Sequence, residues 1–319
     1  MTIKDLARLS GYSVGTVSRA LNGLPNVSEQ ARSAILALAQ ERGYQLNTNA
    51  KYLKQIHSSG IVAVVTGTSN ELFAQMIERI QQTLPTDRYP LTVDYVDENE
   101  DPVERALHLS REKKPAGLLF LGGDASRLGF DNLSSVTTDD VEAAECAMEY
   151  LLESGHRRIG VIAGDLSCSG PSRLRYEGCL LALERCGLTL PDECCATARY
   201  AFQDGYDAAL RLLEQPGLTA IFAMSDVMAI GAMRALHDRG LRIPEDISVI
   251  GFDGLELGEF YTPKLTTIRQ QASLLVDRGV ALLLGTLERG AVARHETVPF
   301  TLAVRESTSH PPRKDGTNS

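Results

Sequence analysis

The sequence predicts an α/β protein in which a small all-helical N-terminal domain precedes a larger body built on a doubly wound parallel sheet. Three observations support this prediction. The 319 residues exceed the usual size of one domain. The first 45 residues carry three short helix patterns. From residue 61 onward, buried-strand patterns alternate with helical ones, which is typical of parallel α/β folds.

Each of the three N-terminal helices has its own start and stop signals. Thr2 and Asp5 have the spacing of a capping box, and Gly11 is expected to end the first helix. Ser13 can cap a second helix over residues 14–21, and Ser28 a third over 29–42. Two helices joined by a three-residue turn, with a third completing the core, form a helix-turn-helix arrangement.

The body is expected to contain six buried strands, each followed by a turn rich in small polar residues. The strands are expected at residues 61–65, 91–95, 117–121, 159–163, 220–224 and 248–252. In doubly wound sheets, ligands bind beyond the carboxyl ends of the strands, here at 66–70, 122–124, 164–165, 225–226 and 253–254. The residues in these turns suit a polyol or sugar pocket, but they are equally typical of helix capping, so both readings stay open.

The charge is unevenly distributed along the chain. The total is −9, yet residues 1–54 hold seven basic and three acidic side chains, a balance of +4. The other 265 residues therefore carry −13. A basic head on an acidic body suggests that only the head meets phosphate groups.

Several protein classes find no support in the sequence. No apolar run approaches the length needed to span a bilayer, and the N-terminus lacks a signal-peptide pattern, so we expect a cytoplasmic protein without membrane contact. The six cysteines show no zinc-site spacing, and we expect no metal and no cofactor. The motifs GxGxxG, GxxxxGK[ST] and GxSxG are absent, so the chain is not expected to be an enzyme.

Several motifs together resemble the lac-repressor (LacI/GalR) family. The N-terminal match runs from Thr2-Ile3-Lys4-Asp5-Leu6-Ala7 through Thr16-Val17-Ser18-Arg19-Ala20-Leu21-Asn22. Later matches include 155–159, 225–231, 247–253 and 263–268, so the resemblance covers nearly the whole chain. It implies a homodimeric transcriptional regulator, and a body similar to periplasmic sugar-binding proteins, with two lobes and an effector between them.

The resemblance also implies a division of the chain. Residues 1–45 would form the DNA-binding domain, 46–58 a hinge helix or linker, and 59–310 the effector-binding and dimerisation body. Within the body, lobe 1 would comprise 59–154 and 269–295, and lobe 2 would comprise 155–268 and 296–310. Three crossovers between the lobes are expected near 154–158, 266–271 and 293–298, and residues 311–319 are expected to be a disordered tail.

The resemblance places the second helix in the major groove of operator DNA. Arg19 is the best candidate for reading guanine, because its fork matches O6 and N7 together, although contact with phosphate alone is the alternative. The hydroxyl and amide side chains would position the protein on phosphates, and Val14 could touch a thymine methyl group. The DNA-facing candidates in this region are Ser13, Val14, Gly15, Thr16, Ser18, Arg19, Asn22 and Ser28.

Residues 50–54 resemble the family's hinge helix, which folds on operator DNA. Leu53 would be the wedge in the minor groove, with Lys51 and Lys54 on flanking phosphates. The alternative is an exposed linker with an incidental leucine. Leu46 stands where relatives usually have proline, which predicts a less rigid entry to the hinge.

The resemblance also marks candidate effector-binding residues in the body. Arg175 and Asp253 match side chains that reach effector hydroxyls from the second lobe, and a structural salt bridge between the lobes is the alternative. Tyr200 could stack on a sugar ring, whereas Phe73 could equally belong to the core. The candidates are Asn70, Phe73, Asp139, Arg175, Tyr200, Ser225 and Asp253.

One segment departs from the family. Only ten residues separate Gly123 from Ser134, where relatives fit a helix and another buried strand. About 20 residues are therefore missing relative to the family pattern, and the completeness of the lobe 1 sheet is in question.

The sequence thus favours a repressor that binds operator DNA as a homodimer under the control of a small effector, most simply a sugar. Two alternatives stay open at this point: a solute-binding protein, and an enzyme of doubly wound fold.

Overall fold

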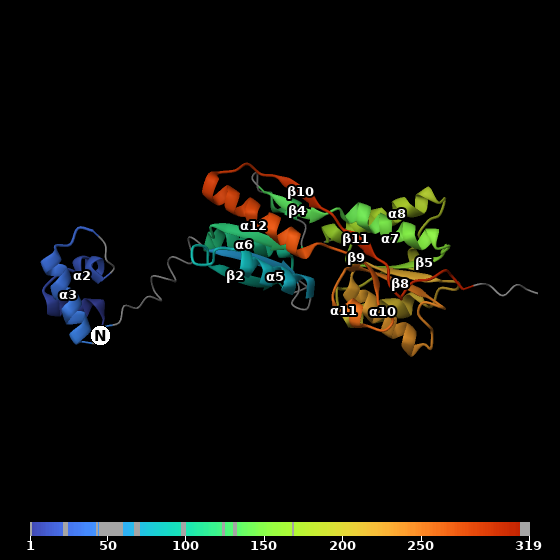
Figure 1. Ribbon diagram of the computed structural model, residues 1–319, viewed down its shortest axis with the longest axis horizontal. Helices are drawn as coiled ribbons and strands as arrows, with labels where there is room; N and C mark the ends of the chain where they lie inside the picture. Colours follow the sequence, from blue (N-terminus) through green and yellow to red (C-terminus); the bar gives the residue numbers. More distant parts are fainter. Residues whose placement is uncertain are drawn as a thin grey trace, which may run out of the picture. The chain divides into compact units, whose positions relative to one another are not determined.

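The computed structural model describes residues 2–21, 25–42, 44, 60–66, 71–96, 100–122, 125–129, 133–167 and 169–312. The chain divides into two compact units, Met1–Ile56 and His57–Ser319. Both units have the predicted architecture, with three helices in the described part of the first and parallel sheets with covering helices in the second (Figure 1).

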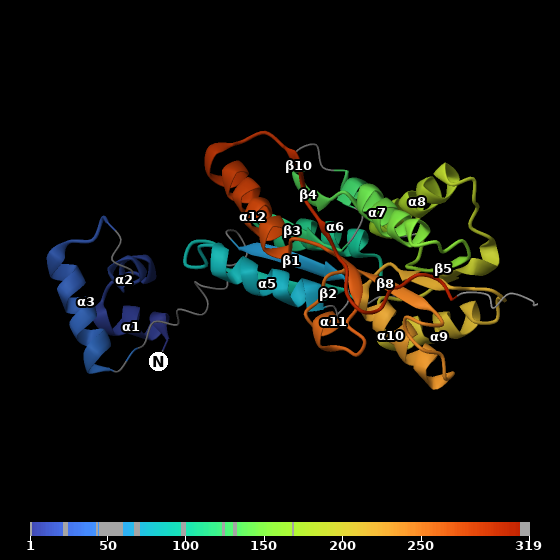
Figure 2. The ribbon, with the colours of Figure 1, turned by 45° about the vertical axis from the view of Figure 1, so that its right-hand side comes forward.

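The first unit contains α1 (Ile3–Ser10), α2 (Val14–Leu21) and α3 (Glu29–Glu41) (Figure 2). The predicted capping box is confirmed, because Thr2 Oγ1 accepts a hydrogen bond from the Asp5 amide at 3.3 Å and the Thr2 amide donates to Asp5 Oδ2 at 3.0 Å. Gly11 ends α1 with a φ of 74°, a conformation that glycine adopts without strain. The buried core of the unit consists of Leu6, Ala7, Val17, Ala20, Ile35 and Ala39.

Lobe 2 of the body is built on one six-stranded sheet in the order β11-β9-β8-β7-β5-β6. The strands are β5 (Ile159–Ala163), β6 (Cys195–Thr197), β7 (Ala220–Ala223), β8 (Ser248–Asp253), β9 (Thr266–Arg269) and β11 (Thr301–Ala303). All neighbours pair in parallel except β11, which runs antiparallel to β9. The sheet is therefore doubly wound, with one antiparallel edge strand that returns from lobe 1.

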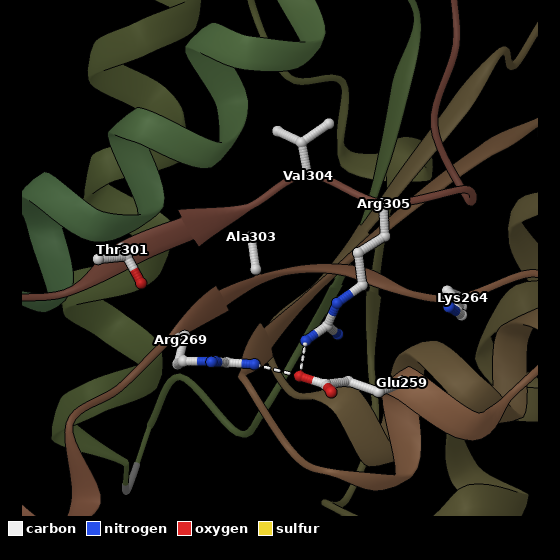
Figure 3. A pocket seen from close by; sticks show the side chains of 7 residues that line it. All are labelled: Glu259, Lys264, Arg269, Thr301, Ala303, Val304 and Arg305. Atoms are coloured by element: carbon white, nitrogen blue, oxygen red, sulfur yellow. Dashed lines mark hydrogen bonds and ion pairs between the residues drawn. The ribbon is translucent and has the colours of Figure 1, made fainter.

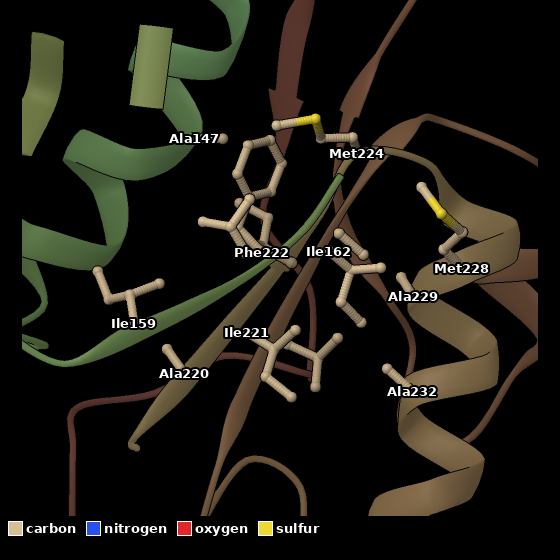
Figure 4. Close-up of a cluster of buried hydrophobic side chains, with 14 of the residues drawn as sticks. Ala147, Ile159, Ile162, Ala220, Ile221, Phe222, Met224, Met228, Ala229 and Ala232 are labelled. Atoms are coloured by element: carbon tan, nitrogen blue, oxygen red, sulfur yellow. The ribbon is translucent and has the colours of Figure 1, made fainter. Parts of the chain in front are cut away.

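Helices cover both faces of this sheet. α7 (Asp140–Glu153) and α8 (Gly170–Arg185) lie on one face, and α9 (Phe202–Leu212) and α10 (Asp226–Asp238) on the other (Figures 1 and 2). Figure 4 shows Ala147 of α7 on one side of the central strands and Ala232 of α10 on the other, with Phe222 between the layers. The buried apolar side chains of these strands and helices form one continuous cluster, which is the core of lobe 2.

Lobe 1 has a smaller and divided sheet. A three-stranded parallel sheet has the order β2-β1-β3, and β10 pairs in parallel with β4 in a separate two-stranded sheet. The strands are β1 (Ile61–Thr66), β2 (Leu91–Val96), β3 (Gly117–Leu121), β4 (Ser135–Thr138) and β10 (His295–Val298). The helices are α5 (Glu71–Thr83), α6 (Pro102–Lys113) and α12 (Ala272–Arg289). α5 and α12 cover one face and α6 the other.

The division of this sheet follows from the short segment after Gly123. Among the described residues no strand lies between β3 and β4, which is where the family pattern would place the missing strand. A single 3₁₀ turn, Ala125–Leu128, replaces it, and Leu128 is buried beside Val62 and Leu109. α12 contacts both β3 and β4 and so connects the two sheets. Lobe 1 therefore keeps its apolar core although its hydrogen-bonded sheet is interrupted.

The structure corrects two of the expected lobe boundaries. α7 packs against α8 and contributes Ala143, Ala147 and Leu151 to the lobe 2 core, so the first crossover lies at 138–140 and not at 154–158. β10 pairs with β4 of lobe 1 up to Val298, so the third crossover lies at 299–300, just past the expected range. The apolar face of α7 could not reveal on its own which lobe it covers, which explains the first error.

The remaining expectations concern the cysteines, metal sites, membrane-spanning helices and the C-terminal tail. Of the six cysteines, the five within the described ranges are free thiols. In those ranges no group of His, Cys, Asp and Glu side chains is arranged to hold a metal ion. No described helix is long and apolar enough to cross a membrane. Of the expected tail, 311–319, only Pro311 and Pro312 lie within the described residues.

Candidate DNA-binding face and effector site

α2 presents one exposed face whose side chains carry the DNA-binding prediction. Val17 and Ala20 are buried in the core of the unit, whereas Val14, Gly15 and Arg19 are exposed. Val14 is 43% exposed, so its methyl groups are available for contact. The helix therefore exposes a methyl-bearing side chain and a guanidinium, two kinds of group that contact base edges in direct readout.

Arg19 lies back along α2 over Gly15. Both terminal nitrogens of Arg19 lie 3.9 Å from the position that a Cβ on residue 15 would occupy. Ser13 Oγ accepts a hydrogen bond from the Thr16 amide at 3.2 Å and lies 2.9 Å from the Thr16 hydroxyl. Because Gly15 has no side chain, only backbone lies between the start of α2 and the Arg19 guanidinium.

The remaining DNA-facing candidates divide into two groups. Ser28 caps α3, its Oγ accepting from the Ala31 amide at 3.3 Å, and its hydroxyl hydrogen stays available to donate. Ser18 is half-buried on α2 and has an interaction within the structure. Asn22, Lys51, Leu53 and Lys54 lie outside the described residues, as does the whole expected hinge at 46–58.

A buried ionic cluster in lobe 2 brings together the strongest effector candidates. Arg175 on α8 donates through Nε to Asp140 Oδ1 at 2.7 Å and through Nη1 to the Met224 carbonyl at 2.6 Å. Its Nη1 lies 3.9 Å from Asp253 Oδ1, and its guanidinium carbon lies 3.6 Å from the centroid of the Phe252 ring. Burial lowers the pKa of Arg175, but Asp140 and Asp253 outweigh it and raise the pKa, so the guanidinium stays charged.

The position of Arg175 follows from close packing of two helices. A Cβ at Gly178 would lie 2.2 Å from the Val141 carbonyl oxygen, so only glycine lets α8 approach the start of α7. Arg175 lies about one helical turn before Gly178, which brings its guanidinium beside Asp140. The close contact between α7 and α8 thus positions Arg175 to pair with Asp140.

Asp253 ends β8 in a strained conformation. Its φ is 119°, which side-chain-bearing residues rarely adopt and which costs about 1–3 kcal/mol. Gln270 Nε2 donates to Asp253 Oδ1 at 2.8 Å, and Gln270 Oε1 accepts from Thr138 Oγ1 of lobe 1 at 3.0 Å. Burial raises the pKa of Asp253 to about 6, although Arg175 lowers it. A strained, buried carboxylate beside a lobe crossover is typical of a ligand site.

A second buried carboxylate lies next to Asp253. Asp226 accepts from Thr267 Oγ1 at 2.5 Å and from the Leu255 amide at 2.6 Å. Burial, and then the charge of Asp253, raise the pKa of Asp226 to about 8. Asp226 therefore holds the turn after β8 in place, and the charge of Asp253 contributes to its raised pKa.

Tyr200 extends the polar cluster. Its hydroxyl lies 2.6 Å from Ser172 Oγ, and burial raises the pKa of the phenol while Arg175 lowers it. A Cβ at Gly164 would lie 2.7 Å from the Tyr200 ring, so the glycine after β5 makes room for this tyrosine. Tyr200, Arg175 and Asp253 thus interact electrostatically in one group.

The other effector candidates are not in this group. Ser225 is fully buried and caps α10, accepting from the Met228 amide at 3.2 Å. Phe73 packs on the lobe 1 core and covers Gly122. Asp139 is exposed and caps α7, with Oδ1 accepting from the Glu142 amide at 3.0 Å. Asn70 lies outside the described residues.

Sequence reasoning missed Asp140 and Gln270. Asp140 follows the proposed Asp139 directly, and the choice between them depends on which one caps the helix, which the sequence left undecided. Gln270 lies inside the crossover expected at 266–271. A polar side chain at that place could have indicated a residue that bonds to both lobes.

Comparisons with known proteins agree with this arrangement. Residues 2–47 match the model of bacterial regulatory proteins of the lacI family, and residues 148–308 match the periplasmic binding protein-like domain. The HTH-type transcriptional repressor PurR of Pasteurella multocida is 31% identical over 330 residues, covering 95% of this chain and 98% of that protein. The ribose operon repressor of Escherichia coli K12 is 32% identical over 304 residues, covering 89% and 92%.

A solved structure extends the likeness over both units. The lac repressor dimer bound to operator and the anti-inducer ONPF is 26% identical, with a TM-score of 0.73, covering 97% of this chain and 99% of that one. The three-helix unit, the two-lobed body and these relatives point to one conclusion. The chain belongs to the lacI family of bacterial regulatory proteins and is an effector-controlled, DNA-binding regulator of transcription.

Proposed function

We propose that this regulator is a homodimeric repressor whose α2 reads an operator and whose Arg175–Asp253–Tyr200 cluster binds a polyhydroxylated effector, most simply a sugar. The observation that carries the effector proposal is the strained, buried Asp253 beside Arg175. A carboxylate and a guanidinium supply the acceptors and donors that adjacent hydroxyls need. The ribose operon repressor among the relatives supports a sugar, and a nucleoside or base is the alternative that the experiment below tests.

The DNA-binding part is tested with the full-length chain. Operator sequences are selected from a random duplex pool, and affinity is then measured by fluorescence anisotropy. Arg19→Lys keeps the charge but loses the fork, so we expect a loss of about 1–3 kcal/mol on the selected operator and little change on random DNA at the same salt. An equal loss on both DNAs would show that Arg19 contacts phosphate alone.

The hinge proposal rests on the sequence, because its residues lie outside the described ranges. Leu53→Ala should weaken operator binding at least about tenfold and reduce DNA bending, with random DNA unaffected, because a neutral side chain releases no counterions. Lys54→Ala should weaken both kinds of binding and reduce the salt slope by about one unit. If Leu53→Ala bends operator like the parent, residues 46–58 are only a tether.

The effector part is tested by thermal shift with panels of sugars, nucleosides and purine bases. We expect one sugar to stabilise the body and to change operator affinity. Asp253→Asn should abolish that response while leaving operator binding intact without ligand. A response that survives in Asp253→Asn would place the effector elsewhere, and stabilisation by a nucleoside or a base alone would contradict a sugar effector.

The homodimer proposal has support on the surface of the body. The short helix α11 (Leu257–Phe260) exposes Leu257 by 39% and Phe260 by 77%. Exposed apolar side chains of this kind mark protein contacts, and a two-fold dimer matches a pseudo-palindromic operator. Phe260→Glu should yield monomers in sedimentation experiments, whereas a dimer with unchanged affinity would exclude α11 from the contact.

We propose further that the protein acts in the cytoplasm, because its operator lies on the bacterial chromosome. The relatives reported above are transcriptional regulators, which favours regulation over the solute-carrier and enzyme alternatives.

A further inference from the structure

An open cavity of about 300 Å³ lies at the antiparallel edge of the lobe 2 sheet. Its lining comes from α11, the approach to β9, the end of β9, and β11 with the residues after it, and it includes none of the effector candidates. Figure 3 shows its charged members, Glu259, Lys264, Arg269 and Arg305. The cavity therefore combines three positive charges with one negative charge.

The single carboxylate is shared by two guanidinium groups. Arg305 Nη2 donates to Glu259 Oε1 at 2.6 Å, and Arg269 Nη2 donates to the same oxygen (Figure 3). Arg305 is held in place, since its Nη1 donates to the Leu265 carbonyl at 2.8 Å and its side chain is only 11% exposed. Within the lining, Glu259 neutralises one of the three cations and leaves two positive charges. Glu306 lies outside the lining but close to it, with Oε2 accepting from the Lys264 backbone amide at 2.9 Å.

Two nitrogen donors of the lining residues lack a partner within the described structure. The Lys264 ammonium forms no ion pair with any described residue. Within the described structure, the Arg269 Nε is buried and has no hydrogen-bond partner. A buried donor without an acceptor is costly, so such atoms usually mark a missing ligand or water. An anion in the cavity would supply an acceptor to the buried Arg269 Nε and a counter-charge to the exposed Lys264 ammonium.

We propose that this cavity is a binding site for a small phosphate-bearing anion, separate from the effector site. Guanidinium forks match phosphate oxygens, and lysine supplies a point charge. A phosphate monoester carries about −1.5 to −2 at pH 7, which matches the two surplus charges of the lining. The cavity lies at the lower limit of small-ligand pockets, so the ligand is small.

The site lies where two crossovers meet. Arg269 precedes Gln270, the residue that links Thr138 of lobe 1 to Asp253. Thr301, also in the lining, pairs with Arg269 at the start of β11, directly after the third crossover. An anion held between these strands would restrain both crossovers and act as a second input to operator binding. This consequence rests on the proposed function, but the binding itself does not.

The binding test uses the full-length chain and isothermal titration calorimetry with inorganic phosphate and glycerol 3-phosphate, and with glycerol as the neutral control. We expect both phosphate compounds to bind and glycerol to show no heat. Lys264→Gln should weaken phosphate binding about tenfold, because it removes one charge-assisted contact from an exposed residue that the fold does not need. Arg269→Gln should weaken it at least as much.

A matched control removes one positive charge elsewhere. Arg239 is exposed at the end of α10 and makes no ion pair in the described structure, so Arg239→Gln should bind phosphate like the parent. The proposal is overturned if no phosphate compound binds at millimolar concentration, or if Lys264→Gln and Arg239→Gln bind equally. It is also overturned if Asp253→Asn abolishes binding while Lys264→Gln does not, because the phosphate would then occupy the effector site. Failure of operator binding would leave all these outcomes unchanged.

Discussion

At the scale of single residues, the chemistry of the body depends on which of two adjacent aspartates faces inward. Asp139 caps α7 from the surface. Asp140 pairs with Arg175 in the interior, where the Asp140 side chain is 11% exposed and the Arg175 side chain 7%. Breaking a buried pair leaves an uncompensated charge, whereas an exposed cap loses little when Asp becomes Asn.

We therefore expect Asp140→Asn to lower the free energy of unfolding by about 2 kcal/mol, while Asp139→Asn changes it by about 0.5 kcal/mol at most. Urea unfolding of both variants measures the difference. Equal effects would mean that the Met224 carbonyl and Asp253 suffice to hold the guanidinium.

Asp226 predicts a pH dependence of stability. Its pKa is raised to about 8, so the folded protein keeps a proton that the unfolded chain releases above about pH 4. Stability from this group is therefore complete below pH 4 and is lost as pH rises towards 8. Asp253, with a pKa near 6, contributes the same sign but only up to about pH 6.

Asp226→Asn should accordingly flatten the fall in the free energy of unfolding between pH 6 and 8, by up to about 1.4 kcal/mol per pH unit. Asp246→Asn is the control, since Arg242 lowers the pKa of Asp246 to about 2 and its contribution is constant in that range. Because each variant is compared with the parent, histidine titration cancels. Parallel curves for the parent and Asp226→Asn would refute the assignment.

At the scale of elements, patterns with strong local signals were predictable. The N-terminal helices and β1, β3, β5 and β8 were placed to within a residue or so, because caps and fully apolar runs mark them. β6, β10 and β11 were not predicted as strands. They have three or four residues each and are partly exposed, so no alternation could identify them.

The candidate site was predictable only in part, for a related reason. Arg175, Tyr200 and Asp253 came from motif resemblance and do interact. Ser225 caps α10, and an N-cap and a ligand contact need the same residue types at a helix start, so its contact with an effector stays a prediction. Asp140 depends on the Gly178 contact between α7 and α8, which is set by tertiary packing.

The divided sheet of lobe 1 predicts uneven hydrogen exchange. Among the described strands, β4 pairs only with β10, and β3 only with β1, whereas β1 has a neighbour on each side and β7 lies between β5 and β8. Amides of β4 should therefore exchange well before those of β1 and β7, as peptide-level mass spectrometry would record. The comparison with β1, in the same lobe, separates an edge effect from a weak lobe. Protection of β4 equal to that of β1 would contradict an open edge.

At the scale of the whole molecule, control of DNA by an effector requires two lobes that respond to one another. Thr138 of β4, Gln270 at the second crossover and Asp253 at the end of β8 form one hydrogen-bonded chain across the lobes. Coupling between effector and operator is a shared free energy, so each ligand must change the affinity of the other by the same factor.

Thr138→Val removes the first link of this chain without changing the shape of the buried side chain. We expect the coupling factor to shift by about 0.5–2 kcal/mol, with both lobes still folded. Operator titrations with and without effector, and effector titrations with and without operator, should give one and the same changed factor. Thr137→Val is the matched control, because Thr137 lies next along β4 and is exposed. If both variants keep the parent's coupling, the lobes communicate through the packing of α12 and the crossover backbone, and the Gln270 bridge has only a structural role.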